Sequence, residues 1–220
     1  MLKCIWLNNM IIDIIRRYKM INSNELLIIP IIDNKKCYGF LFPITKNYEQ
    51  LIPNCIELFT TWRIENPTLS PSTFKVTKER TRKWLNESVV DNDNRLLFMI
   101  TDMGFKCVGH IGLTNFRDEN TAEIDSVLKG IKKGYPKYMQ LSLFSLMKWA
   151  KHNLGIVNFD LEVLQDNNHA INFYKKCSFV EKGIIPLKRV EFNQETRWER
   201  ANMNEAEKYY LYMEYEEKKQ

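Results

Sequence analysis

The stretch that decides the fold is "DNNHAINFYKKCSF", residues 166–179. Ile171 and Tyr174 lie where a helix that begins after Asn167 would turn an apolar stripe toward a core. Residues 166–168 are all of types whose side chains accept hydrogen bonds from the amides of a first helical turn. The stretch also contains a histidine and a cysteine. Taken alone, it therefore indicates either a capped core helix or a reactive cluster.

The apolar residues around this stretch change their period several times. A period of about two predicts strands, and a period near 3.6 predicts helices. Three consecutive strands, followed by a strand–helix–strand unit, indicate an α/β (α+β) fold with a mixed sheet and helices on both faces. The predicted strands are 25–33, 37–45, 94–102, 105–116, 121–129, 156–164, 178–187 and 207–216; the predicted helices are 48–63, 77–88, 138–154 and the quoted stretch.

Composition limits the class of protein. Of the 220 residues, 45% are hydrophobic and 27% charged, which is typical of a globular protein. A net charge of +5 can help to recruit an anionic ligand but falls short of the basic footprint of a nucleic-acid binder. The five cysteines are scattered and show no C-x-x-C spacing. We therefore expect no nucleic-acid partner, no metal, no disulfide framework and a reducing, cytoplasmic location.

The N-terminal sequence "MLKCIWLNNMIIDIIRRYKM", residues 1–20, has only short apolar runs between polar residues. These runs are too short for a signal peptide or a membrane span. The isoleucines at 11, 12, 14 and 15 suit a docked helix, with an interfacial membrane helix as the alternative. The following "ELLIIPIID" predicts an edge strand or a bulged strand because Pro30 interrupts it.

These elements predict a division of the chain. We expect residues 1–35 to be an extension that docks on a core domain of residues 36–220. If its apolar positions were all exposed, they would form a large patch of a kind that monomers avoid. The alternative is that the extension docks across a two-fold interface and continues a sheet through the strand at 26–32. We therefore expect a homodimer.

A second informative stretch is "KGIKKGYPKYMQ", residues 129–140. It joins a predicted strand to a predicted helix start. Backbone amides at a helix N-terminus form an anion site, and glycines let that backbone approach a phosphate closely. Lys132, Lys133 and Lys137 would add positive charge. The stretch is either a phosphate-binding loop or a solvated basic loop.

Together, the two stretches resemble the GNAT superfamily of acyl-coenzyme A-dependent N-acyltransferases. The family pattern Asn-x-x-Ala-Ile-x-x-Tyr-x-x-x-Gly-Phe is met by Asn167, Ala170, Ile171, Tyr174 and Phe179, with Ser178 in place of the glycine. The family's pyrophosphate loop, Arg/Gln-x-x-Gly-x-Gly/Ala, is divergent here. With Gly134 as its first glycine, Ile131 and Pro136 occupy the other two defined positions. The resemblance spans residues 38–190.

The resemblance implies a twisted mixed sheet with a splayed pair of parallel strands, here 122–129 and 159–164. It implies that the pantetheine of acetyl-CoA, or of another short acyl-CoA, pairs with backbone groups near Val127 and Leu128. The implied coenzyme-binding residues are Val127, Leu128, Lys129, Lys133, Gly134, Tyr135, Pro136, Lys137, Tyr138, Met139, Asn167 and Tyr174.

Tyr174 matches the family tyrosine that acts as the acid for the coenzyme sulfur; the alternative is a core aromatic residue. For the base, the candidates are Asp125 and His110. Strand alternation predicts Glu123, Asp125 and Val127 on one side of their strand. A carboxylate just before the coenzyme-binding end of a strand is well placed to attract an ammonium. His110 is either a proton relay or a hydrogen-bonded histidine of the sheet.

The acceptor side is predicted from "ELFTTWRIENP" and "TKERTRKWLNES", which resemble the segment of GNAT enzymes that acylate nucleotide-linked amino sugars. Arginine suits a nucleotide diphosphate because it forms paired hydrogen bonds. We therefore expect N-acylation of a dideoxy amino sugar on a nucleotide, for surface polysaccharide synthesis, with an acetyl or short acyl group that can be hydroxylated. Trp62 is either an acceptor contact or a buried anchor. The candidate acceptor-binding residues are Trp62, Arg63, Asn115 and Glu123.

Two other functions fit the sequence. One is a GNAT acetyltransferase that acts on a protein N-terminus or on a polyamine. A polyamine site needs acidic surroundings, and the positive net charge disfavours it. The other is a non-catalytic coenzyme A-binding module. Turnover of any amine with acetyl-CoA would distinguish an enzyme from a module.

Overall fold

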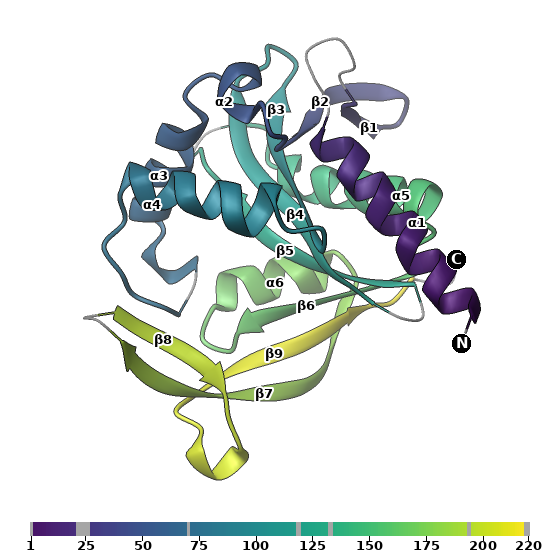
Figure 1. Cartoon of the computed structure of the whole chain (residues 1–220). Helices are drawn as coiled ribbons and strands as arrows, with labels where there is room; N and C mark the ends of the chain where they lie inside the picture. The colour runs from purple at the N-terminus through teal and green to yellow at the C-terminus, as the bar shows by residue number, and fades with distance from the viewer. Residues whose placement is uncertain are drawn as a thin grey trace. The chain divides into compact units, whose positions relative to one another are not determined.

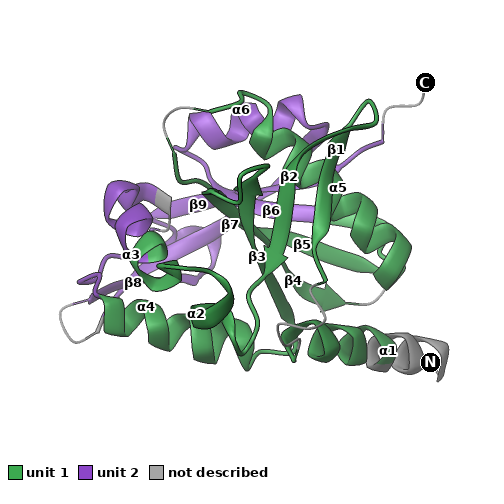
Figure 2. Cartoon of the chain, turned by 90° about the horizontal axis from the view of Figure 1, so that it is seen from above, with its two compact units in different colours: residues 1–59, 78–159 green, residues 60–77, 160–220 purple. Residues whose placement is uncertain are grey.

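The computed structural model describes residues 2–20, 27–69, 71–117, 120–131, 134–192 and 195–217. Within it the chain forms two compact units, each built from two separate segments (Figure 2). Unit 1 comprises residues 1–59 and 78–159, and unit 2 comprises residues 60–77 and 160–220. The predicted boundary at residue 35 stays a prediction.

Unit 1 contains a sheet of five antiparallel strands in the order β1-β2-β3-β4-β5. The edge strand β1 carries Pro30 and has a register shift after Ile31, as its sequence predicts. The three consecutive strands of the middle region are also confirmed. The strands are β1 (Ile29–Asp33), β2 (Lys36–Pro43), β3 (Arg95–Asp102), β4 (Cys107–Arg117) and β5 (Thr121–Lys129).

Helices cover both faces of this sheet (Figure 1). On one face, the Trp149 ring of α5 lies 5.8 Å from the Phe98 ring of β3. On the other face, the Phe59 ring of α3 stacks on the His110 ring of β4, with the centroids 4.7 Å apart. The prediction of helices on both faces is confirmed for unit 1. Its helical elements are α1 (Leu2–Lys19), α2 (Tyr48–Leu51), the first part of α3 (Cys55–Glu65), α4 (Lys78–Trp84), the π-helical turn η2 (Leu85–Val90) and α5 (Tyr138–Leu154).

The predicted helix over 48–63 is interrupted. Helix α2 ends at Leu51 and α3 begins at Cys55. Pro53 lies between them and cannot donate the backbone hydrogen bond that a continuous helix needs there. The predicted helix over 77–88 is also modified, because α4 continues beyond Trp84 as a π-helical turn.

The last turns of α1 are fixed to unit 1. Ile11 and Ile15 are buried. The indole Nε1 of Trp149 donates a hydrogen bond of 2.9 Å to the Tyr18 hydroxyl. The buried Lys19 ammonium donates to the carbonyl of Asn92, and burial lowers the pKa of Lys19 to about 8. These contacts place the C-terminal part of α1 on the same face as α5. Part of the predicted pairing strand, residue 26, lies outside the described residues.

A strand–helix–strand unit leads from β5 through α5 to β6 (Asn158–Leu164). At its start, the carbonyl of Asn120 accepts hydrogen bonds from the amides of Val157 and Asn158, at 2.8 and 3.2 Å. Asn120 immediately precedes β5, and Val157 immediately precedes β6. The two strands therefore begin side by side and run in the same direction, as a parallel pair does.

Unit 2 contains four strands in the order β6-β9-β7-β8, with β9 antiparallel to β6 and β7, and β7 antiparallel to β8. The sequence predicts β7 only as far as residue 187 and does not predict β8. The reason is that β8, "ETRWER", has four charged residues out of six and lies at an edge. Its further elements are η1 (Pro67–Leu69), α6 (Asn168–Lys176), β7 (Phe179–Phe192), β8 (Glu195–Arg200), η3 (Met203–Glu205) and β9 (Lys208–Tyr215).

Three global observations bear on function. In the described parts of the chain, no helix is long and apolar enough to cross a membrane. Among the same residues, no group of three or more histidine, cysteine or acidic side chains is arranged to hold a metal ion. The four cysteines whose side chains are described, Cys37, Cys55, Cys107 and Cys177, are free thiols.

Candidate active site

The pairing of β4 with β5 is irregular at the predicted catalytic residues. His110 pairs with Leu128, whereas Gly112 pairs with Asp125, so β5 carries one extra residue between these pairs. Ser126 lies in this bulge and has a φ of +52°, in the left-handed region that side chains rarely adopt. The predicted alternation of Asp125 and Val127 is therefore wrong. The bulge breaks it, and Leu128 instead is in phase with Asp125.

His110 holds this bulge. Its Nδ1 lies 2.6 Å from the Ser126 carbonyl oxygen, so Nδ1 carries the proton and donates it to that bond. The side chain is only 3% exposed, and burial lowers the pKa of His110 to about 4. The imidazole is consequently neutral at neutral pH. Of the two sequence interpretations, this geometry favours the hydrogen-bonded histidine of the sheet.

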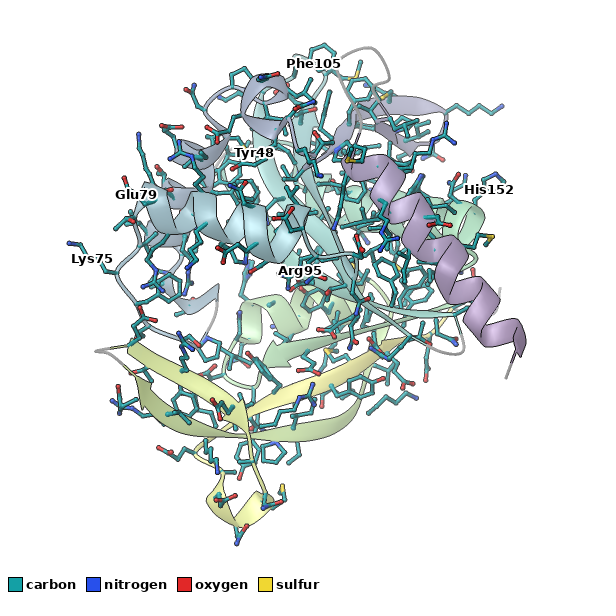
Figure 3. The ribbon with its side chains drawn as sticks, in the orientation of Figure 1. Tyr48, Lys75, Glu79, Arg95, Phe105 and His152 are labelled. Atoms are coloured by element: carbon teal, nitrogen blue, oxygen red, sulfur yellow. The ribbon has the colours of Figure 1, made fainter. Side chains whose placement is uncertain are left out.

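Asp125 forms an ion pair with Arg95, which is labelled in Figure 3. The Arg95 Nη2 lies 2.8 Å from the Asp125 Oδ2. The same carboxylate oxygen accepts a hydrogen bond of 3.0 Å from the Ser126 hydroxyl. Both side chains of the pair keep about a quarter of their surface exposed, 21% for Arg95 and 26% for Asp125. The carboxylate is therefore oriented and partly neutralised, yet still open to solvent.

Two predicted acceptor-binding residues lie further along the same strands. Asn115 in β4 donates a hydrogen bond of 3.1 Å from its amide Nδ2 to the Glu123 carboxylate of β5. Asn115 has a φ of +53°, which asparagine adopts more readily than most residues. Unit 1 thus carries His110, Asp125, Asn115 and Glu123 on two adjacent strands, as the sequence predicts.

The glycine loop (residues 129–139) leads from β5 into the first turn of α5. The Gly130 amide donates to the Val108 carbonyl at 2.9 Å. Gly134 has a φ of +137°, a conformation that needs glycine. The Tyr138 amide then closes a turn on the Tyr135 carbonyl at 3.1 Å. Lys129, Pro136 and Lys137 are exposed and Met139 is buried. Lys132 and Lys133 lie outside the described residues.

In unit 2, the stretch "DNNHAINFYKKCSF" forms the helix α6. Of the three candidate caps, Asn167 performs the role, because its Oδ1 accepts a hydrogen bond of 3.1 Å from the Ala170 amide. Tyr174 is 8% exposed and its ring packs edge-on against Phe173 and Phe179, at 5.3 and 5.8 Å. Burial raises the pKa of the Cys177 thiol to about 11, so this cysteine is not a reactive thiolate.

Trp62 and Arg63 belong to the part of α3 that lies in unit 2. Trp62 is 4% exposed, as expected of a buried anchor. The Arg63 guanidinium donates to the carbonyls of Asn66, Pro67 and Ser72, at 3.1–3.2 Å, and lies over the Phe74 ring. Arg63 therefore holds the segment that follows its own helix.

Three features of the site are not predicted from the sequence. They are the partner Arg95, the left-handed Ser126 and the contact of the glycine loop with β2, in which the Tyr138 hydroxyl donates a hydrogen bond to the Tyr38 carbonyl. Each one depends on two segments that only the folded sheet brings together, so no local pattern could reveal them.

The comparisons with known proteins agree with this geometry. Residues 51–180 match the family model described as an acetyltransferase (GNAT) domain. No curated protein matches the sequence significantly.

Several solved structures share the fold at low sequence identity. A probable GNAT-family acetyltransferase from Chromobacterium violaceum is 13% identical, with a TM-score of 0.62 over 84% of this chain and 85% of that chain. An acetyltransferase from Salmonella typhimurium that modifies the N-terminal serine of ribosomal protein L7/L12 is 15% identical, with a TM-score of 0.60 over 85% and 96%. The spermidine/spermine N-acetyltransferase of Vibrio cholerae is 14% identical, with a TM-score of 0.52 over 80% and 91%.

Proposed function

We propose, on the premise that this chain belongs to the GNAT acetyltransferase family of acyl-CoA-dependent enzymes, that it acylates the amine of a nucleotide-linked dideoxy amino sugar. The observation that carries the proposal is the bulge of β5 at Ser126. It separates Asp125 from the last three residues of β5, which lead into the glycine loop. One short segment thus carries a carboxylate for the amine and a loop for the coenzyme.

The coenzyme would bind along the end of β5 and the start of α5. Backbone groups near Val127 and Leu128 would pair with the pantetheine amides. The positive end of α5 and the exposed Lys129 and Lys137 would face the pyrophosphate. The turn at Tyr135–Tyr138 supports this, because its hydrogen bond fixes the backbone just before the first turn of α5.

The chemistry requires an unprotonated amine and a way to stabilise the departing thiolate. Asp125 would attract the ammonium and take its proton, directly or through water, before nitrogen attacks the thioester carbonyl. The C–N bond then forms as the C–S bond breaks. The Tyr174 hydroxyl would give its proton to the departing coenzyme sulfur, and the excess proton on the acylated nitrogen would pass through water to the Tyr174 phenolate, which restores the phenol. His110 would act as a positioning residue, because its neutral imidazole holds Ser126 and hence Asp125.

The charges around Asp125 limit the class of acceptor. Arg95 neutralises the carboxylate that a polyamine would need, which favours an acceptor without several positive charges. Asn115 and Glu123 offer polar groups of the kind that bind sugar hydroxyls. Trp62 and Arg63 would act indirectly, by fixing the segment after α3. We also expect a cytoplasmic homodimer that serves surface polysaccharide synthesis.

A second acceptor class is supported by the structures that share the fold. They include an acetyltransferase that modifies the N-terminal serine of a ribosomal protein and a spermidine/spermine N-acetyltransferase. The low identity restricts this likeness to the fold. A single panel of acceptors, given in the next paragraph, tests all of these acceptor classes.

The test is release of free thiol from acetyl-CoA and other short acyl-CoA donors. The acceptors are nucleotide-linked amino sugars, a peptide with a free N-terminal serine, and spermidine. The proposal expects release with an amino-sugar nucleotide. Release of thiol with only the peptide, or with only spermidine, would show that this compound is the acceptor and that an amino-sugar nucleotide is not. Binding of coenzyme A without release for any amine would make the protein a coenzyme-binding module.

A further inference from the structure

Three tyrosines connect the glycine loop to strand β2. The Tyr135 ring, in the loop, stacks on the Tyr38 ring of β2, with the centroids 4.8 Å apart and the planes 16° apart. The Tyr138 ring, at the start of α5, meets Tyr135 edge-on at 5.8 Å. The Tyr138 hydroxyl donates a hydrogen bond of 3.0 Å to the backbone carbonyl of Tyr38. The loop is thus held by a ring contact and by a polar contact.

The side chains around Tyr38 strengthen this arrangement. The proximity of the Tyr38 phenol raises the pKa of Tyr135, which agrees with the close stacking of the two rings. The Lys36 ammonium lies 5.3 Å from the centre of the Tyr38 ring. All three tyrosines are half-buried.

Strand β2 is itself fixed in the sheet next to these contacts. Gly39 follows Tyr38 directly, and a Cβ built on Gly39 would lie 2.0 Å from the Thr101 carbonyl oxygen of β3. This close approach leaves β2 little freedom to shift relative to β3. The Tyr38 ring is therefore a firm support against which a glycine-containing loop can be ordered.

We infer that Tyr38 is a positioning residue that orders the glycine loop for the coenzyme. This inference rests on the proposed function, in which that loop binds the pyrophosphate. Tyr38 precedes the residues that the family model matches, which begin at 51. A loop that is already ordered binds its ligand more tightly, because less conformational entropy is lost on binding.

The experiment measures coenzyme A binding to the full chain by titration calorimetry, for the original protein and for Tyr38→Ala, Tyr38→Phe and Tyr138→Phe. An aromatic pair or a hydrogen bond of this kind corresponds to a change of about 3- to 10-fold in Kd. We expect Tyr38→Ala and Tyr138→Phe to weaken binding by that factor. Tyr38→Phe keeps the stacked rings and should stay within about threefold of the original.

Phe40→Ala is the matched control. Phe40 lies two residues further along β2, and its ring contacts are with Phe42 and Phe105 at the turn after β3. It should leave the Kd unchanged. Steady-state kinetics add a second readout. The KM for acyl-CoA should rise in Tyr38→Ala, whereas kcat and the acceptor KM should not.

The outcomes separate the inference from the proposed function. If the original protein does not bind coenzyme A, the coenzyme role of the loop fails, and the inference fails with it. If the original binds, and Tyr38→Ala and Tyr138→Phe bind equally well, the inference alone is overturned. Should Tyr38→Ala fail to fold, Tyr38→Leu, which fills the space of the side chain without an aromatic ring, replaces it and decides the question.

Discussion

Arg95, at the start of β3, and Asp125, in the middle of β5, form an ion pair at 2.8 Å across the intervening strand β4. The pair sets the charge that an acceptor amine meets. Removing Arg95 leaves the carboxylate unpaired and makes the surface more attractive to polycations. We expect Arg95→Gln to raise kcat/KM for spermidine relative to an amino-sugar nucleotide by about 2- to 5-fold, the scale of an exposed ion pair. Competition between the two acceptors measures this ratio. Arg82→Gln, which loses an ion pair with Glu49, is the control and should not change it.

Tyr174→Phe should keep coenzyme binding and lower turnover. The phenyl ring preserves the packing against Phe173 and Phe179, so stability should hardly change. Loss of an acid catalyst typically lowers kcat by about 100- to 10,000-fold. Tyr215→Phe, whose ring also contacts Phe179, is the matched control and should retain turnover. Full activity of Tyr174→Phe would leave Tyr174 only a structural role.

His110 should make stability depend on pH. Burial lowers its pKa from 6.5 to about 4 in the folded protein. Between these values the unfolded chain binds a proton that the folded chain does not. Stability should therefore fall as the pH drops from about 6.5 to about 4, by roughly 3 kcal/mol. Urea unfolding at several pH values measures this fall. His110→Gln should remove this contribution. An identical pH dependence in the variant would contradict the assignment.

The docking of α1 can be tested by two substitutions on the same helix. Ile15 is completely buried, and Ile15→Ala should reduce the free energy of unfolding by about 2–4 kcal/mol. Met10 is 38% exposed, so Met10→Ala should change it by about 0.5 kcal/mol or less. Equal effects in chemical unfolding would mean that the helix is not held as described.

Two strand glycines make a further matched pair. A Cβ on Gly109 would lie 2.2 Å from the Leu128 carbonyl oxygen, whereas a Cβ on Gly183 meets nothing within 4 Å. Gly109→Ala must separate β4 from β5 beside His110, and we expect a loss of at least ~2 kcal/mol. Gly183→Ala should be neutral or slightly stabilising. Thermal unfolding of both variants gives the comparison.

Much of the fold can be predicted from the sequence, because the spacing of apolar residues and the capping of helices are properties of short stretches of chain. Asn167, Ile171 and Tyr174 carry the signal of α6 within one stretch, and the alternation of β3 to β5 is equally local. The limits of the 48–63 helix were less predictable, since Pro53 breaks a pattern that otherwise continues. The strand β8 was missed because four of its six residues are charged and form no apolar face.

The candidate site is less predictable because its contacts are long-range. Arginine is a residue type that often binds anionic ligands. The guanidinium of Arg63 instead donates its hydrogen bonds to the backbone carbonyls of Asn66, Pro67 and Ser72. The conformation of Ser126 follows from the bulge in β5 opposite β4, which cannot be predicted from the serine itself. The residue types thus indicate the chemistry of the site. The pairing of the strands determines which side chains lie close enough together to perform it.

The bridge between Thr73 and Thr196 has a consequence for synthesis of the chain. Thr73 belongs to the segment 60–77, but its partner strand β8 is translated much later. Closing so long a loop costs entropy that local contacts do not repay. Unit 2 can therefore assemble only after β8 has left the ribosome. Until then, Trp62 and its neighbours, which are buried in the folded protein, lack their final partners in the nascent chain. We therefore expect a chaperone to bind this segment during synthesis.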